Sequence, residues 1–144
     1  MSALTAFLLD PCAESAGAMR AILAKQEIEV VEWSTSGTGW VAAFQSKRPD
    51  FLVVDYMLPR RDGIFCLAKA REIAPSVKAF FTHRFTGLAA NELELKALAL
   101  GAQAVAQKPI VEGRFEELLA RAVHIHKWEN SQKQRTMTLT PTKK

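Results

Sequence analysis

Five short apolar runs, each followed by a longer stretch with helical spacing of its apolar residues, constrain the fold of this 144-residue chain more than any other feature. The runs are rich in β-branched, aromatic and leucine residues, a composition that favours strands. Alternation of strand and helix is typical of βα units, whose strands lie parallel in one sheet. The predicted strands are residues 5–9, 29–33, 51–55, 77–81 and 104–107.

The stretches between the runs carry apolar residues at three- and four-residue spacing, which predicts helices with one buried face. These helices are expected at residues 13–25, 39–46, 63 to the residue before Pro75, 90–100 and 112–129. Residues 51–54 are apolar on both faces of their strand, so helices must cover both sides of the sheet. The sequence therefore predicts a doubly wound α/β fold, a five-stranded parallel sheet inside a three-layer sandwich.

Length and composition predict one folded domain. A chain of 144 residues, 49% of them apolar and 24% charged, is expected to build one hydrophobic core. The charged and polar end lacks the apolar residues that a core requires. We expect the domain to span residues 1–129, and residues 130–144 to form a polar linker or tail.

Several classes of protein are disfavoured. The net charge of +4 comes from scattered residues, so the folded part is not expected to bind nucleic acid. Cys12 and Cys66 have no CxxC partner, which argues against a zinc site or a disulfide framework. The first residues lack the basic start of a signal peptide, and the roughly 18 consecutive apolar residues of a membrane span are absent. We expect a cytoplasmic protein with no membrane contact.

Polar residues stand at four predicted strand ends: Asp10, Asp55, Thr82 and Lys108. In a parallel sheet these ends share one edge, where ligands bind. Two carboxylates are the oxygen ligands that Mg²⁺ prefers, and a hydroxyl and an ammonium group can contact phosphoryl oxygens. A carboxylate can attack phosphorus and form an aspartyl phosphate. Each residue also has a structural reading: Asp10 as a helix cap, Thr82 at a strand end, Lys108 as a solvated loop cation.

Residues 54–63, VDYMLPRRDG, resemble the phosphoacceptor segment of response-regulator receiver domains, where an Asp precedes a Met or Leu, then Pro, then Gly. Residues 101–109 resemble the fifth strand of that family with its Lys-Pro pair, and residues 79–82 resemble its fourth strand ending in Thr or Ser. The resemblance covers residues 5–129 and implies the flavodoxin-like (βα)5 form of the fold.

The resemblance implies a phosphorylatable switch in two-component signalling, not an enzyme with its own substrate. Asp55 would accept a phosphoryl group from a sensor histidine kinase or a histidine phosphotransfer protein. Thr82 and Lys108 would contact that group, and Mg²⁺ would be held by Asp10, Asp55 and the backbone carbonyl of Met57. A homodimer through the fourth and fifth helices is a further expectation of this kind. Residues 139–142 resemble the opening of DNA-binding output domains, so DNA is expected as a partner only if such a domain follows residue 144.

Three positions depart from the family pattern. One acid stands where two are usual, so Asp10 represents either the second acid, with Leu9 replacing the first, or the first acid, with Pro11 replacing the second. Either way the affinity for Mg²⁺ is expected to be lower. Val105 occupies the position of a usual switch aromatic. The connection over residues 83–91 is expected to be long, and the bulk of His83 is expected to slow entry of water or donor.

Two functions therefore stay open, a working phosphoacceptor and a phosphorylation-independent pseudo-receiver that acts as a protein-interaction scaffold. A phosphatase of the haloacid-dehalogenase type needs a second acid two residues after Asp55, and Met57 is there instead. A flavodoxin-like cofactor module needs a hydroxyl-rich phosphate loop after the first strand, where this chain has Glu14. Both of these readings are disfavoured.

Overall fold

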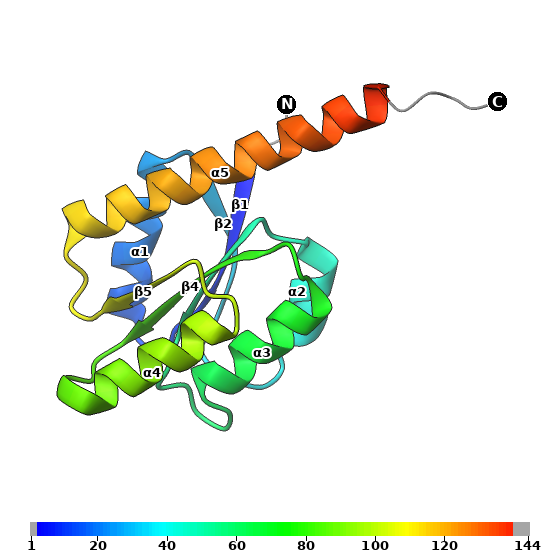
Figure 1. Cartoon of the computed structure of the whole chain (residues 1–144). Helices are drawn as coiled ribbons and strands as arrows, with labels where there is room; N and C mark the ends of the chain where they lie inside the picture. Colours follow the sequence, from blue (N-terminus) through cyan, green and yellow to red (C-terminus); the bar gives the residue numbers. More distant parts are fainter. Residues whose placement is uncertain (1–2, 140–144) are drawn as a thin grey trace.

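Among the described residues, 3–139 of the computed structural model, five parallel strands form one sheet with helices on both faces (Figure 1). The strand order is β2-β1-β3-β4-β5, so the chain leaves β1 toward one edge and then returns to build the other side. The elements are β1 (Leu4–Leu9), α1 (Ala13–Lys25), β2 (Ile28–Ser34), α2 (Val41–Lys47), β3 (Phe51–Asp55), α3 (Gly63–Ile73), β4 (Lys78–His83), α4 (Gly87–Ala99), β5 (Ala104–Gln107) and α5 (Glu112–Leu139). This confirms the predicted doubly wound α/β fold.

Two apolar cores cover the two faces of the sheet. In β1, Phe7 and Leu9 point into the core beneath α2, α3 and α4, and Ala6 and Leu8 point into the core beneath α1 and α5. This alternation follows from the two-residue period of a strand. Every residue of β3 is buried, as expected for a central strand with helices on both sides.

Aromatic side chains fill much of both cores. Under α2, Trp40 and Phe44 lie edge to face with ring centroids 5.4 Å apart, and Phe7 lies 5.5 Å from Phe44. On the other face, Phe80 and Phe115 are 5.6 Å apart in a similar arrangement. Edge-to-face pairs at these distances are favourable beyond the burial of their area. They fix α2 and α5 against the sheet.

Several element ends differ from the prediction. Strand β4 continues to His83, so Thr82 lies inside the strand and not at its last position. Helix α4 begins at Gly87, because Leu88 and Ala89 are good helix formers, and only residues 84–86 connect it to β4. The predicted long connection over residues 83–91 was therefore wrong.

Helix α5 is ten residues longer than predicted, and its last third projects beyond the sheet (Figure 1). Contacts hold the helix where it leaves the body: Lys78 Nζ lies 2.6 Å from Glu129 Oε1. Glutamine, lysine and arginine are common in residues 130–135 and favour a helix even where no core is available. Residues 140–144, and with them most of the segment 139–142, lie outside the described residues.

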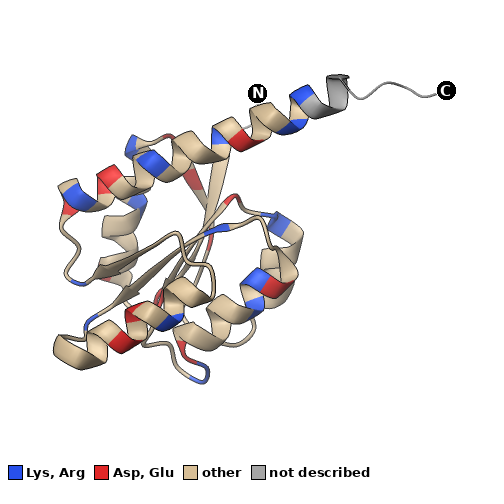
Figure 2. Cartoon of the chain, in the orientation of Figure 1, with Lys and Arg blue, Asp and Glu red and all other residues tan. Residues whose placement is uncertain are grey.

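Charged side chains of both signs are interspersed along the helices (Figure 2). Basic and acidic residues both occur on each of α3, α4 and α5 in this view. Within residues 3–139, no helix combines the length and the apolar content that crossing a bilayer requires.

Helix α4 offers a matched test of the core. Leu93 is 7% exposed and packs against the sheet, whereas Leu95 on the same helix is 68% exposed. We expect Leu93→Ala to lower the free energy of unfolding by about 2 to 5 kcal/mol, because it removes buried contacts and leaves a cavity. Leu95→Ala should change it by less than about 0.5 kcal/mol. Urea unfolding followed by circular dichroism measures both, and equal losses would contradict the assigned faces of α4.

Candidate functional site

The four polar residues predicted at strand ends meet at the carboxyl edge of the sheet. Asp55 is the last residue of β3 and pairs in register with Thr82 of β4, and Asp10 and Lys108 directly follow β1 and β5. At this edge β1 lies between β2 and β3, and the connections that follow β1 and β3 lead in opposite directions along the sheet. Such a switch point is where open α/β sheets bind ligands.

Lys108 joins the two acids. Its Nζ lies 2.8 Å from Asp10 Oδ2 and 2.8 Å from Asp55 Oδ1. Lys108 is 6% exposed and Asp55 is 4% exposed, so this ion-pair cluster is almost entirely removed from water. Charges that are buried to this degree are tolerated only when each finds a partner. The cluster therefore ties together three strands of the sheet.

Further hydrogen bonds hold both carboxylates. The Thr82 hydroxyl donates to Asp55 Oδ1 at 2.9 Å, and the Met57 backbone N–H donates to Asp55 Oδ2 at 3.0 Å. The Cys12 backbone N–H donates to Asp10 Oδ1 at 2.9 Å. The two acids are thus held in fixed orientations, with Asp55 at the centre of the group. The structural reading of Asp10 as the cap of α1 is not observed, because Cys12 occupies that position.

The glycine of the VDYMLPRRDG segment has a steric role. The Gly63 N–H donates to the Tyr56 carbonyl at 2.9 Å, so the loop after β3 closes back on its own start. A Cβ atom at this position would lie 2.2 Å from the Asp55 carbonyl oxygen and 2.8 Å from Tyr56 Cα. Only glycine permits this approach. The loop therefore holds Met57, and with it the N–H that binds Asp55.

A groove of about 460 Å³ lies between α1 and the loop after β5, beside this cluster. Asp10 and Lys108 line it, together with Glu14 and Arg84. Glu14 is exposed, as expected for an acid in the first turn of α1. Within the described residues, no group of three or more His, Cys, Asp or Glu side chains could hold a metal ion. An oxygen-based site here has to use a backbone carbonyl and water in addition to the two acids.

His83 is a buried polar residue whose position was not foreseen. It is 0% exposed, and its Nε2 lies 3.0 Å from Glu94 Oε2 of α4. Its Nδ1 accepts the Phe85 N–H at 3.0 Å. The ring is thus directed at α4, whereas the sequence suggested bulk at the entrance of the site. No local pattern could have indicated this, because the partner lies eleven residues away on the next helix.

The two cysteines lie in different environments. Cys12 precedes α1, where hydrogen bonds from the Ser15 backbone and then the Ser15 side chain lower the pKa of its thiol. Cys66 is fully buried in the core under α3, and desolvation raises the pKa of its thiol to about 11. Cys12 is therefore the more ionised thiol at neutral pH.

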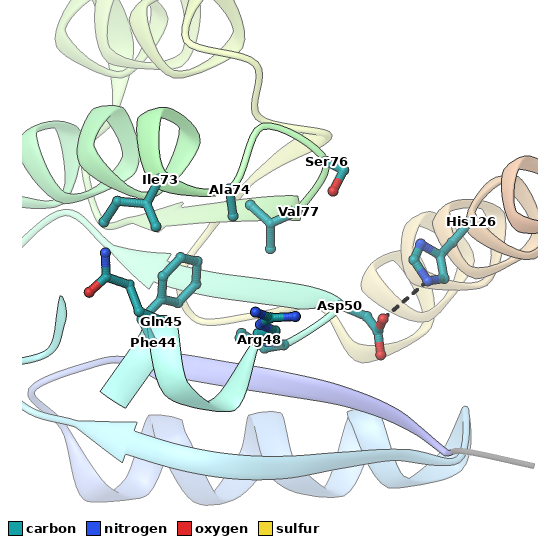
Figure 3. Close-up of a pocket in the computed structure, with 10 residues that line it drawn as sticks. Phe44, Gln45, Arg48, Asp50, Ile73, Ala74, Ser76, Val77 and His126 are labelled. Carbon is teal, nitrogen blue, oxygen red and sulfur yellow. Dashed lines mark ion pairs between the residues drawn. The ribbon is translucent and has the colours of Figure 1, made fainter. Parts of the chain in front are cut away.

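A separate pocket of about 510 Å³ lies at the opposite end of the sheet (Figure 3). Its walls come from the ends of α2 and α3, and His126 of α5 closes one side with Nε2 3.3 Å from Asp50 Oδ1. None of the four predicted site residues lines it. This pocket is therefore separate from the ion-pair cluster of Lys108, Asp10 and Asp55.

A buried carboxylate at the switch point of a doubly wound sheet, held by a hydroxyl, a lysine and a backbone N–H, defines a class of α/β signalling domain. Residues 7–121 match the family described as response regulator receiver domain. The chain belongs to this family, whose members are the receiver domains of two-component response regulators.

Curated relatives and solved structures agree with this. The chain is 30% identical over 101 residues to chemotaxis protein CheY of Treponema pallidum, covering 69% of this chain and 68% of that protein. It is 27% identical over 128 residues to protein-glutamate methylesterase/protein-glutamine glutaminase 3 of Geobacter sulfurreducens, covering 88% of this chain but 33% of that protein. The chain thus spans about a third of the length of that relative.

Among solved structures, a CheY-like receiver domain protein from Methanospirillum hungatei superimposes with a TM-score of 0.77 at 20% identity, covering 89% of this chain and 99% of that one. The signal receiver domain of a Luxo repressor protein from Vibrio parahaemolyticus gives a TM-score of 0.78 at 15% identity, covering 90% and 96%. At this level of identity the comparison establishes the fold alone.

Removing the lysine of the cluster tests its structural role. We expect Lys108→Met to lower the free energy of unfolding by about 3 to 5 kcal/mol, because two buried carboxylates lose their common counter-charge. Lys96→Met, on the exposed side of α4, is the matched control and should change it by less than about 0.5 kcal/mol. Urea unfolding decides the outcome. If both variants unfold like the wild type, the buried ion-pair cluster is not a source of stability.

Alkylation tests the contrast between the two thiols. At pH 7.5 we expect iodoacetamide to modify Cys12 first, because its pKa is lowered and its side chain is partly exposed. Cys66 should react only after denaturation, since it is buried and its pKa is raised. Peptide mass spectrometry over a time course follows each site. Equal rates in the native protein would contradict this assignment.

Proposed function

We propose that Asp55 accepts a phosphoryl group from a phosphohistidine of a sensor histidine kinase or a histidine phosphotransfer protein, and that this modification switches partner binding. The main support is the surroundings of Asp55: the Thr82 hydroxyl and Lys108 Nζ both contact Oδ1, and the Met57 N–H contacts Oδ2. A hydroxyl and an ammonium group beside one carboxylate oxygen are the donors that phosphoryl oxygens require.

Transfer of the phosphoryl group to Asp55 would proceed as follows. An Asp55 oxygen attacks phosphorus, a P–O bond forms, the P–N bond to the donor imidazole breaks, and the imidazole leaves with its proton. The Met57 N–H orients the carboxylate through Oδ2. Thr82 and Lys108, released from Oδ1, then pair with phosphoryl oxygens and stabilise the charge that accumulates there.

The donor set is compatible with Mg²⁺, which favours oxygen ligands and retains several waters. Asp10 and Asp55 already converge on one cationic atom, Lys108 Nζ, so their oxygens can share a cation. Asp10, Asp55 and the Met57 carbonyl would hold the ion. When bound, it supplies neutralising charge for the carboxylates and the incoming phosphoryl group. With one acid fewer than is usual in the family, the affinity should be low.

A phosphorylation-independent scaffold is the second candidate. The observation that favours it is that Lys108 pairs with both acids at once, so each buried carboxylate already has a cationic partner within the protein. Val105 offers no aromatic ring that could report phosphorylation. In this alternative the domain would recognise partners through its helices alone.

The proposed function also concerns partners and location. A cytoplasmic location and a homodimer through α4 and α5 belong to the same proposal, and DNA is a partner only if an output domain follows residue 144. Receiver domains interact with histidine kinases, and the relatives show that such domains occur within longer proteins. For this chain, the open groove beside Asp10 and Lys108 is the route by which a phosphohistidine would reach Asp55.

Incubation with acetyl phosphate and Mg²⁺, followed by intact mass spectrometry, tests the phosphoacceptor. The wild type should gain about 80 Da, the mass of one phosphoryl group, because acetyl phosphate can donate directly to a carboxylate. Asp55→Asn should gain nothing, since the amide is not a nucleophile. Asp62→Asn is the matched control, because asparagine also caps α3 at this position, and it should be modified like the wild type.

Two results would contradict the proposal. A gain in mass that persists in Asp55→Asn would place the modification elsewhere. No gain in the wild type over a range of Mg²⁺ concentrations would favour the scaffold.

A further inference from the structure

The buried ring of His83 is hydrogen-bonded through both of its nitrogen atoms. Nδ1 accepts the Phe85 N–H at 3.0 Å, which leaves the ring proton on Nε2 to be donated to Glu94 Oε2 at 3.0 Å. The ring is 0% exposed and stacks on Phe85 with centroids 6.3 Å apart. A displacement of the His83 backbone therefore cannot be absorbed by rotation of its side chain without loss of one of these bonds.

The backbone of His83 is attached directly to the phosphoacceptor site. It follows Thr82, whose hydroxyl contacts Asp55, and its carbonyl accepts the Lys108 N–H at 2.6 Å. His83 thus lies between the two residues that bind Asp55 Oδ1. A shift of either one acts on the backbone of the same residue, Thr82 through the peptide bond before His83 and Lys108 through the carbonyl after it.

Phosphorylation requires such a shift. Thr82 Oγ1 and Lys108 Nζ lie 2.9 and 2.8 Å from Asp55 Oδ1, so this oxygen has no room for a phosphoryl group. The hydroxyl and the ammonium group must move to pair with the new oxygens. The loop cannot take up the motion on its own, because Gln107 Nε2 donates to the Phe85 carbonyl at 2.7 Å. In addition, Tyr56 lies edge to face against the Phe85 ring, with centroids 5.3 Å apart.

The geometry points to His83 and Glu94 as the link between the phosphoacceptor site and α4. We infer that phosphorylation of Asp55 displaces His83 and weakens its hydrogen bond to Glu94, which releases α4 from β4. This inference rests on the proposed function, and it gives the chain a means of transmission that does not need an aromatic side chain at position 105. Glu94 here is a positioning residue that acts through His83.

Helix α4 is suited to pass the change on. Its outer face carries three leucines, Leu88, Leu95 and Leu98, with exposed fractions of 80%, 68% and 48%. Glu94 is directly beside Leu95, so loss of the His83 contact changes how firmly this apolar face is held. An apolar surface whose mobility depends on Asp55 can bind a partner differently in the two states.

The first experiment uses unphosphorylated proteins, so it tests the coupling of His83 and Glu94 to α4 whether or not Asp55 can be phosphorylated. Amide hydrogen exchange of residues 87–99 is compared in Thr82→Val, Glu94→Ala and the double variant. Valine removes the Thr82 hydroxyl at similar volume, and we expect it to raise exchange in α4 by about fivefold, as for the loss of one hydrogen bond. In the Glu94→Ala background the same change should add less than twofold, because the link is already broken.

Two variants serve as controls. Glu94→Gln keeps an oxygen that accepts from Nε2 and should behave like the wild type, and Glu92→Ala removes an exposed acid from the same helix and should have no effect. If Thr82→Val raises exchange in α4 by the same factor in the wild-type and in the Glu94→Ala background, His83 and Glu94 do not couple the site to α4. The inference is then wrong.

The second experiment compares phosphorylated proteins whose modification is verified by intact mass. Acetyl phosphate and Mg²⁺ should increase exchange in α4 of the wild type and of Glu94→Gln, and the increase should be mostly absent in Glu94→Ala. A gain of mass with the same response of α4 in all three would overturn the inference and leave the proposed function intact. If no protein gains mass, the proposed function fails, and the first experiment still decides the link.

Discussion

The contact of Lys108 with Asp10 and Asp55 is the interaction on which the architecture of the site depends. A buried ammonium group is stable only beside opposite charge, and here two carboxylates supply it at 2.8 Å each. The three residues come from the ends of β1, β3 and β5, so the sheet must bring these ends to one edge. The strand order β2-β1-β3-β4-β5 does this by placing β1 and β3 at the switch point. The same edge is therefore required by stability and by chemistry.

The buried apolar residues of the strands fix the positions of the polar residues at their carboxyl ends. Each residue of β3 before Asp55 is buried between two cores, which fixes the height of the carboxylate relative to β1 and β4. The loop that follows is closed by Gly63, which approaches the Asp55 carbonyl too closely for any side chain. As a result the Met57 N–H binds Asp55 Oδ2 from the main chain, while Thr82 and Lys108 bind Oδ1 through their side chains. Packing sets the position of the Asp55 carboxylate, and the loop helps to set its direction.

Local patterns in the sequence predicted the succession of strands and helices, and they predicted that Asp10, Asp55, Thr82 and Lys108 meet at one edge of the sheet. Apolar runs such as 51–54 identify strands, and a polar residue at the end of each run identifies the edge. The bond between His83 and Glu94 could not be predicted, since it depends on how α4 crosses the sheet. The length of α5 was underestimated because residues 130–139 have few apolar side chains, so no apolar periodicity marks them as a helix. Interactions between elements are thus what the sequence did not reveal.

The missing acid affects the net charge of the cluster around Lys108, and it leaves the fold unchanged. With two ionised carboxylates and one ammonium group, the cluster carries one net negative charge, which repels an incoming phosphoryl dianion. A bound dication would reverse that sign and attract the donor, whereas a second acid beside Asp10 would have left a neutral site under the same conditions. One acid fewer would therefore weaken the binding of Mg²⁺ in the proposed site, but a bound ion would leave a positive charge toward the phosphoryl group. The proposed reaction at Asp55 would therefore require a higher concentration of Mg²⁺ for half-occupancy of the site.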